Sequence, residues 1–511
     1  MVGGETIIPT DSVKFLGVTL DNKLNFNKHI DKITNKSIAT LMQCKRAVGS
    51  TWGLTPKSCK WIFETVIRPA LSYAIVIWVR ALNTKKNMKK LERVQALALK
   101  IMTGAMPSTP HYALNSLTNT INIGCYLKGE AAKGAARLKS YKDWTLTTAP
   151  TGKGIIIAHS TISNNFLTSI NILNTENRDL IRPFLSIDKN YSITFPKQED
   201  IQHYRNDLNI NTTNKPPDSI DCYTDGSKTG DGVGGGYFTI YNDLDNEQTD
   251  SYMFKLPDYC SVFQAELTAL AEGAKSLLCY NNRNITFWTD SLASLHALNS
   301  KLINSNTVAL CHKHISELAA NNTVHIKWIA AHSGHWGNEQ ADKLAKQGTA
   351  CNNIIDGYIP HSLIKHKIND KVKEMNKEIW DSFPHKHTQL ILGHKAKDSI
   401  NSLNTNLLNR RKPYRHAIQL ITGHIGLNKH LHTMTISNTD ICPKCDLEPE
   451  SVTHFLTSCP AYTQVRADFF CNYFNNITDI NEHFDITHVV NFAIKTNRFL
   501  SPEDRDQTGV T

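Results

Sequence analysis

Short apolar runs and segments of helical spacing alternate in the middle of the chain. Runs at 285–289 and 324–329 predict strands, and each is followed by a segment of helical periodicity. A Gly-rich turn at 230–236 separates two more strands and predicts a β-hairpin, and residues 251–257 predict a third antiparallel strand. This alternation favours an α/β fold, with a mixed five-stranded sheet and flanking helices.

The rest of the chain is mainly helical by the same criterion, after one β-rich run at 12–20. Pro56 suits the first turn of a helix, and Gly104 suits a helix stop. Helices are predicted at 23–45, 56–82, 85–103, 362–381, 388–400 and 411–422. The patterns divide the chain into a helical region (1–125), a connector (126–216), the mixed α/β domain (217–350), a basic helical region (351–435), a Cys/His element (436–475) and a tail (476–511).

Charge is distributed unevenly along the 511 residues, whose net charge is +10. Residues 1–150 hold 22 Lys and Arg against 8 Asp and Glu, whereas the remaining residues hold 34 against 38. A basic region of this size favours contact with phosphate backbones, although a solvated lysine-rich surface has the same composition. Within it, Lys85, Lys86, Lys89, Lys90 and Arg93 form a candidate phosphate-facing set.

Four carboxylates of the α/β domain lie at strand ends or on the helices that follow strands: Asp225, Glu266, Asp290 and Asp342. A single acid in such a place is usually a helix cap or a solvated charge. Several acids brought together repel one another, and a hard divalent cation such as Mg²⁺ relieves that repulsion. Two such ions can hold the attacking water and the leaving oxygen of a phosphodiester.

These acids stand in the sequences "TDGS", "AEL", "TDS" and "HSGHWGNEQAD". In the order and spacing of these motifs, residues 217–350 resemble a type 1 ribonuclease H domain of the kind found in non-LTR, jockey-like retrotransposon polyproteins. The resemblance implies that the four acids coordinate two Mg²⁺ ions, or Mn²⁺, and that His332 assists proton transfer or product release. Many relatives have Pro-Gly where this chain has Ala330-Ala331, and this difference bears on how the loop that carries His332 moves.

The resemblance also implies a substrate, the RNA strand of an RNA–DNA hybrid. A protein distinguishes RNA from DNA through contacts to 2′-hydroxyl groups. The backbone near Gly226 and Ser227 and the side chain of Asn338 are candidates for those contacts.

A second set of metal-ligand residues follows in the C-terminal region, with a CxxC turn and an HxxxxC segment. Cys442, Cys445, His454 and Cys459 would give a closed tetrahedral site for a structural Zn²⁺, the alternative being unrelated buried cysteines. A CCHC element often follows the nuclease domain in the same retrotransposon polyproteins. Cys471, His424, His430 and His432 are expected not to bind the ion.

The N-terminal motifs "KFLGVTLDNKLNFNKHIDKI" and "LERVQALALKIMTGAM" resemble the end of a non-LTR reverse transcriptase, which would make residues 1–125 a thumb-like remnant. The paired-Asp motif of the polymerase palm is absent from this chain. The main interpretation is therefore an active ribonuclease H. The alternatives are a non-catalytic nucleic-acid-binding protein derived from such an element, or a remnant with no cellular role.

Three further observations bear on the cellular setting. The most apolar run, Pro69 to Val79, is too short to cross a bilayer and predicts a buried helix. The twelve cysteines are scattered rather than arranged as a disulfide framework. No signal peptide is recognised at Met1. The expectation is an intracellular protein without membrane contact, whose oligomeric state the sequence leaves open.

Overall fold

The computed structural model describes residues 10–49, 52–141, 166–170, 177–186, 189–196, 218–242, 247–382, 386–392, 400–470, 477 and 486–499. These residues form two compact units. Unit 1 holds the described residues of 1–132 and 369–511, and unit 2 holds those of 133–149 and 166–368. Cys471, part of the connector and the residues beyond 499 lie outside the described ranges.

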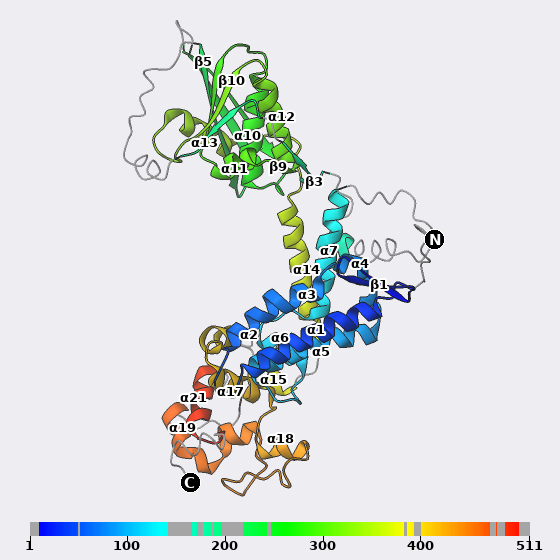
Figure 1. Ribbon diagram of the computed structural model, residues 1–511. Helices are drawn as coiled ribbons and strands as arrows, with labels where there is room; N and C mark the ends of the chain where they lie inside the picture. Colours follow the sequence, from blue (N-terminus) through cyan, green and yellow to red (C-terminus); the bar gives the residue numbers. More distant parts are fainter. Residues whose placement is uncertain are drawn as a thin grey trace. The chain divides into compact units, whose positions relative to one another are not determined.

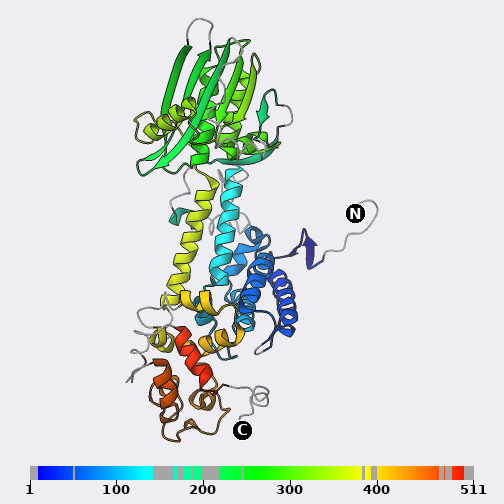
Figure 2. The same cartoon turned by 90° about the vertical axis from the view of Figure 1, so that its left-hand side faces the viewer.

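Unit 2 is built on a six-stranded mixed sheet of order β4-β10-β8-β5-β6-β7 (Figures 1 and 2). Strands β5, β6 and β7 are antiparallel neighbours, whereas β8 pairs in parallel with both β5 and β10, and β10 with β4. Unit 2 contains the strands β3 (Leu180–Leu185), β4 (Ser192–Thr194), β5 (Ser219–Thr229), β6 (Gly232–Asn242), β7 (Glu247–Leu256), β8 (Asn284–Thr289), β9 (Leu302–Ser305) and β10 (Thr323–Trp328). Of these, β3 and β9 lie outside the six-stranded sheet.

The mixed α/β fold and the predicted hairpin are confirmed, with one addition. The sheet has a sixth strand, β4, which comes from residues predicted to be a connector. Three residues are too few to give a recognisable alternation, and β4 depends on pairing with β10 for its existence. The connector also supplies β3, which pairs with β9.

Because successive side chains along a strand point to opposite faces, the two faces of this sheet pack in two different cores. Cys222 and Phe287 contribute to the core shared with α10, α11 and α12, whereas the next residue along β5, Tyr223, packs in the core that includes Ala341 of α13. The helices are α10 (Val262–Ser276), α11 (Leu292–Asn299), α12 (Asn306–Leu318) and α13 (Trp336–Gly348). The edge of the sheet at which β8 ends is therefore bordered by helices on both faces.

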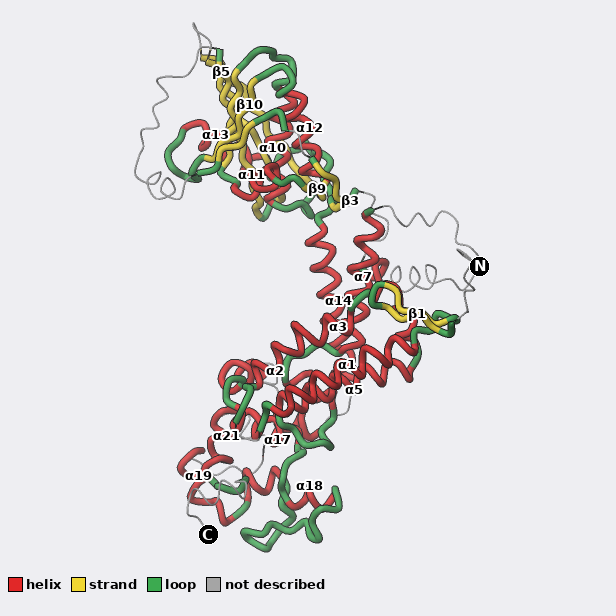
Figure 3. Tube along the Cα trace, viewed as in Figure 1, coloured by secondary structure: helices red, strands yellow, loops and turns green. Residues whose placement is uncertain are grey.

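Unit 1 is mainly helical, with the hairpin β1 (Ser12–Phe15) and β2 (Val18–Asp21) near its beginning (Figure 3). Its helices are α1 (Asn27–Arg46), α2 (Pro56–Ile62), α3 (Arg68–Ser72), α4 (Ile75–Trp78), α5 (Lys85–Thr103), α6 (His111–Leu117), α15 (Lys386–Leu392), α17 (Arg411–Thr422), α18 (Asn428–Thr433), α19 (Thr463–Phe470) and α21 (Ile486–Lys495). The unit boundaries fall within two further helices, α7 (Ile123–Ser140) and α14 (His361–Ser382).

The helix predicted over 56–82 is broken, which corrects that prediction. Ala74 has a left-handed backbone conformation with φ 51°, and the helical hydrogen bonds stop there. Two side-chain bonds hold the break, because the Trp78 indole donates to the Tyr73 carbonyl and the Tyr73 hydroxyl donates to Leu16. Among the described residues, no single helix has the length and apolarity of a membrane span. Helices 56–72 and 75–83, bent by 53°, meet both criteria only as a pair.

One hydrophobic core joins the N-terminal and C-terminal segments of unit 1. It contains Leu91 of α5, Ile418 of α17 and Phe455, although Leu91 is more than 300 positions from the other two. Arg411 links the same segments through hydrogen bonds. Its guanidinium donates to the Leu54 carbonyl at 2.6 and 2.9 Å and to the Ile101 carbonyl at 3.2 Å. The N-terminal helices and the C-terminal region thus share one core.

Replacing Arg411 by Met should destabilise unit 1 by about 2–4 kcal/mol, because one buried and one partly buried carbonyl group lose their donors. Arg410→Met is the matched control, since Arg410 is exposed. Amide hydrogen exchange in α5 and α17 measures the change, and equal exchange in the two variants would contradict this role for Arg411.

Candidate active site and metal centre

Asp225 and Asp290 lie side by side on neighbouring parallel strands, Asp225 within β5 and Asp290 directly after the end of β8. Thr224 of β5 pairs with Thr289 of β8, so the two aspartates are the next residues along each strand. The chain turns immediately after Asp290, because the Ser291 side chain accepts a hydrogen bond from Ser294 N and caps α11. Strand register and a helix cap together place both carboxylates at the edge where β8 ends. The prediction that Asp225 ends its strand is wrong, because β5 continues to Thr229 through its pairing with β6.

Glu266 approaches the same edge from α10. A capping box between Ser261 and Gln264 fixes the start of this helix, and Glu266 follows within its first turns. The helix lies directly against β5 at Gly226, where an added Cβ would be 2.4 Å from the Glu266 backbone nitrogen. Only glycine permits this approach.

The structure brings three of the four acids together. One carboxylate oxygen each from Asp225, Glu266 and Asp290 lies within 4.8 Å of the others. Asp225 and Glu266 are 7% and 6% exposed, and Glu266 Oε2 is buried without a hydrogen-bond partner among the described residues. The fourth, Asp342, is outside this group, and its Oδ2 accepts a 2.6 Å bond from Lys346 Nζ.

Burial and mutual repulsion make these carboxylates hard to ionise. Burial raises the pKa of Asp225 to about 7, and the charges of Asp290 and Asp342 add to the effect. Burial, followed by repulsion from Asp225 and Asp290, raises the pKa of Glu266 well above its ordinary value. Burial also raises the pKa of Asp290, against the opposing effect of His332. The opposing effects of Lys346 on Asp225 and of His332 on Asp290 only partly offset burial and repulsion.

The raised pKa of Asp225 predicts that the stability of unit 2 depends on pH in Mg²⁺-free buffer. Folded Asp225 keeps a proton that the unfolded chain releases above pH 3.8. The free energy of unfolding therefore falls as the pH rises from about 4 to about 7. Asp225→Asn should stabilise unit 2 at pH 8 by on the order of 2–4 kcal/mol, and by much less at pH 5. Denaturant unfolding at both pH values measures this, and a stabilisation independent of pH would contradict it.

The remaining predicted residues surround the acids. His332 is exposed on the loop between β10 and α13, with a left-handed backbone at φ 53°, and it interacts electrostatically with Asp290. Gly226 is buried and Ser227 half-buried in β5. Asn338 is buried near the start of α13, and its Oδ1 has no hydrogen-bond partner among the described residues. Sequence analysis missed Lys346, although its position four residues after Asp342 on a helix predicts an ion pair.

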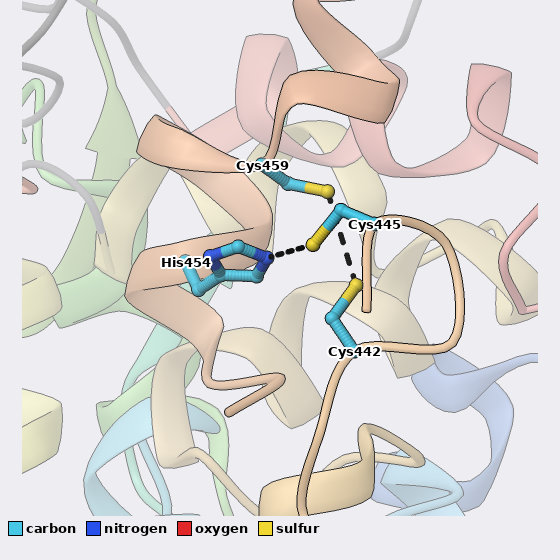
Figure 4. A group of neighbouring side chains, drawn as sticks. All are labelled: Cys442, Cys445, His454 and Cys459. Atoms are coloured by element: carbon cyan, nitrogen blue, oxygen red, sulfur yellow. Dashed lines mark hydrogen bonds between the residues drawn. The ribbon is translucent and has the colours of Figure 1, made fainter. Parts of the chain in front are cut away.

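The Cys/His residues converge in unit 1, as Figure 4 shows. One ligand atom each from Cys442, Cys445, His454 and Cys459 lies within 4.8 Å of the others. The sulfurs of Cys442 and Cys459 are 3.8 Å apart, and Cys445 Sγ is 3.4 Å from His454 Nε2. The set of three thiols and one imidazole fits a tetrahedral metal site.

Neighbouring side chains orient the imidazole of this cluster. Glu448 Oε2 is 3.0 Å and Ser458 Oγ is 3.2 Å from His454 Nδ1, which leaves Nε2 to face the thiols. A carboxylate on the outer nitrogen is a common support for a metal-binding histidine. Cys442 and Cys459 belong to the shared core of unit 1, so the cluster is part of that core.

Comparison with known proteins identifies the family of the α/β domain. The RNase H family model matches residues 217–350. Ribonuclease HI of Helicobacter pylori (strain ATCC 700392 / 26695) is 32% identical over 135 residues, which are 25% of this chain and 90% of that protein.

Two longer relatives come from mobile elements. The retrovirus-related Pol polyprotein from type-1 retrotransposable element R1 4 of Nasonia vitripennis is 27% identical over 133 residues, 26% of this chain and 33% of that protein. The RNA-directed DNA polymerase from mobile element jockey of Drosophila melanogaster is 27% identical over 110 residues, 20% of this chain and 11% of that protein. The chain thus spans a minor part of both. Through the domain at residues 217–350, the chain belongs to the RNase H family.

Proposed function

We propose that this protein is a ribonuclease H that hydrolyses the RNA strand of RNA–DNA hybrids with Mg²⁺, or Mn²⁺, as cofactor. The observation that carries this proposal is the convergence of Asp225, Glu266 and Asp290 from β5, α10 and the end of β8. RNase H family membership supports the reaction class.

The three acids fit a divalent cation on physical grounds. They are hard oxygen donors, their charges repel one another, and one buried oxygen of Glu266 lacks a partner among the described residues. Bound divalent ions would activate the attacking water and stabilise the leaving oxygen of the phosphodiester. Asp225, Glu266 and Asp290 would hold two such ions, and Asp342 would complete the ligand set.

The other residues of the site would handle the proton and the substrate. His332 is exposed beside Asp290, so its imidazole can take up or release a proton at the solvent edge of the site. The backbone of Gly226 and Ser227 lies next to the acids and would contact the RNA strand. The side chain of Asn338, near the start of α13, is the proposed contact to a ribose 2′-hydroxyl.

We also propose a structural Zn²⁺ at Cys442, Cys445, His454 and Cys459. The donor set, the mutual distances and the carboxylate behind His454 support this ion. The matches to the R1 and jockey proteins support an origin in a non-LTR retrotransposon. The basic residues of 1–150 support nucleic acid as the partner.

A panel of labelled duplexes tests the proposed activity. The full chain, with Mg²⁺, should cut the RNA strand of an RNA–DNA hybrid and leave the matching RNA duplex and DNA duplex intact. Equal cutting of all three would contradict the assigned specificity. Binding to the hybrid without cutting would instead fit a non-catalytic nucleic-acid-binding protein.

A further inference from the structure

Asp342 lies on α13, one helical turn before the positively charged side chain of Lys346. The Lys346 ammonium contacts Asp342 Oδ2 at 2.6 Å, and it also interacts electrostatically with Asp225. The side chains are 27% exposed for Asp342 and 55% exposed for Lys346. Of the four predicted acids, Asp342 alone is absent from the cluster whose oxygens lie within 4.8 Å of one another.

These contacts divide the site into two parts. Asp225, Glu266 and Asp290 are held by two neighbouring strands and by a capped helix, and they already converge. Asp342 is more exposed, and a positive charge from the protein already occupies one of its oxygens. A divalent cation that uses this oxygen has to displace the ammonium group.

We propose that Lys346 is a positioning residue, a built-in counter-ion that holds Asp342 in the metal-free site and competes with a divalent cation for its carboxylate. This inference rests on the proposed function, because it concerns the same metal site. The strongly bound ion would use the converged acids, and the weaker ion would need Asp342. Lys346 would therefore set the affinity for the weaker ion.

The expected size of this effect follows from the geometry. A partly exposed ion pair between residues four apart on a helix contributes about 0.3–1 kcal/mol, and tenfold in affinity corresponds to 1.4 kcal/mol. Removing the competitor should therefore strengthen binding of the weaker ion by about two- to fivefold.

The same helix provides a matched control. Lys343 directly follows Asp342 and is exposed, but its ammonium makes no hydrogen bond or ion pair with an acid among the described residues. Lys343→Met and Lys346→Met change the net charge equally. A difference between the two variants therefore reports the contact with Asp342 rather than the overall charge.

The experiment is a Mn²⁺ titration of the full chain without nucleic acid, in which electron paramagnetic resonance measures the free ion. Asp225→Asn protein gives the baseline for ions bound outside the acid cluster. Lys346→Met should lower the dissociation constant of the weaker ion by about two- to fivefold, and Lys343→Met should leave it near the wild-type value. Equal constants in wild type and Lys346→Met, or equal shifts in both lysine variants, would overturn the proposal.

A double variant tests whether the effect acts through Asp342. In an Asp342→Asn background, Lys346→Met should give no further tightening, because the contested carboxylate is gone. Tightening that persists there would overturn the positioning role. Hybrid cleavage by the wild type, measured alongside, tests the proposed function separately, since the binding measurement does not depend on turnover.

Discussion

Asp290→Asn should lower the rate of hybrid cleavage by on the order of a thousandfold, with the fold intact. The amide has nearly the same shape as the carboxylate but carries no charge to hold a divalent ion. Several kcal/mol of transition-state stabilisation would be lost with the ion, and about 4 kcal/mol corresponds to a thousandfold. Because burial disfavours the ionised form of Asp290, the neutral amide should not weaken folding. Single-turnover cleavage with saturating Mg²⁺ measures the loss.

Asp218→Asn is the control for this prediction. Asp218 lies just before β5 in the same domain, and its exposed carboxylate pairs with Arg283 at 2.8 Å, away from the three clustered acids. It should keep nearly the wild-type rate, since an exposed pair contributes little. An Asp290→Asn protein that cleaves at the rate of Asp218→Asn would remove Asp290 from the active site.

Loss of zinc should unfold the C-terminal part of unit 1. Structural zinc sites contribute about 10–16 kcal/mol in small zinc-binding domains, which is comparable with the stability of a whole domain. The Cys442 and Cys459 side chains are buried in the core that also contains Leu91 and Ile418. Purified protein should contain about one equivalent of zinc, and Cys442→Ser should lose it together with the protection of α17 and α21 from hydrogen exchange.

Cys44→Ser is the matched control, because Cys44 is a free thiol of α1 outside the cluster. It should keep its zinc and its protected helices. A Cys442→Ser protein with unchanged metal content and protection would show that the four residues are ordinary core side chains. Cleavage by unit 2 should survive the loss of zinc, because the acid cluster belongs to a different unit.

The parts of the molecule that the sequence predicts are those with local signals. Alternation, the Gly-rich hairpin and helical periodicity predict β5, β6, β8 and β10 and the helices between them, and the structure contains these elements. Asp290 follows the end of β8, and the parallel pairing of β5 with β8 places it beside Asp225, which lies within β5. The CxxC and HxxxxC spacings likewise predict a compact cluster from short segments.

The parts that the sequence does not reveal depend on contacts between distant segments. Strand β4 is three residues long and exists through its pairing with β10. Arg411 looks like one more cation in a basic segment, yet its partners are Leu54, Cys59 and Ile101, more than 300 residues away. No local sequence pattern indicates that Arg411 binds these residues.

Some neighbours of the two candidate metal sites were also missed, although they are close to the ligands in the sequence. The motif that contains Asp342 does not show whether its carboxylate joins the other acids or pairs with Lys346. Glu448 and Ser458 lie among ordinary polar residues, and only the structure shows that both lie beside His454 Nδ1.

The most direct test of the central claim is cleavage of one RNA–DNA hybrid, labelled separately on each strand, with and without Mg²⁺. Wild-type protein should cut the RNA strand only when Mg²⁺ is present, and Asp225→Asn should leave both strands whole. Cleavage without a divalent ion, cleavage of the DNA strand, or equal cleavage by Asp225→Asn would contradict a metal-dependent ribonuclease H at these acids.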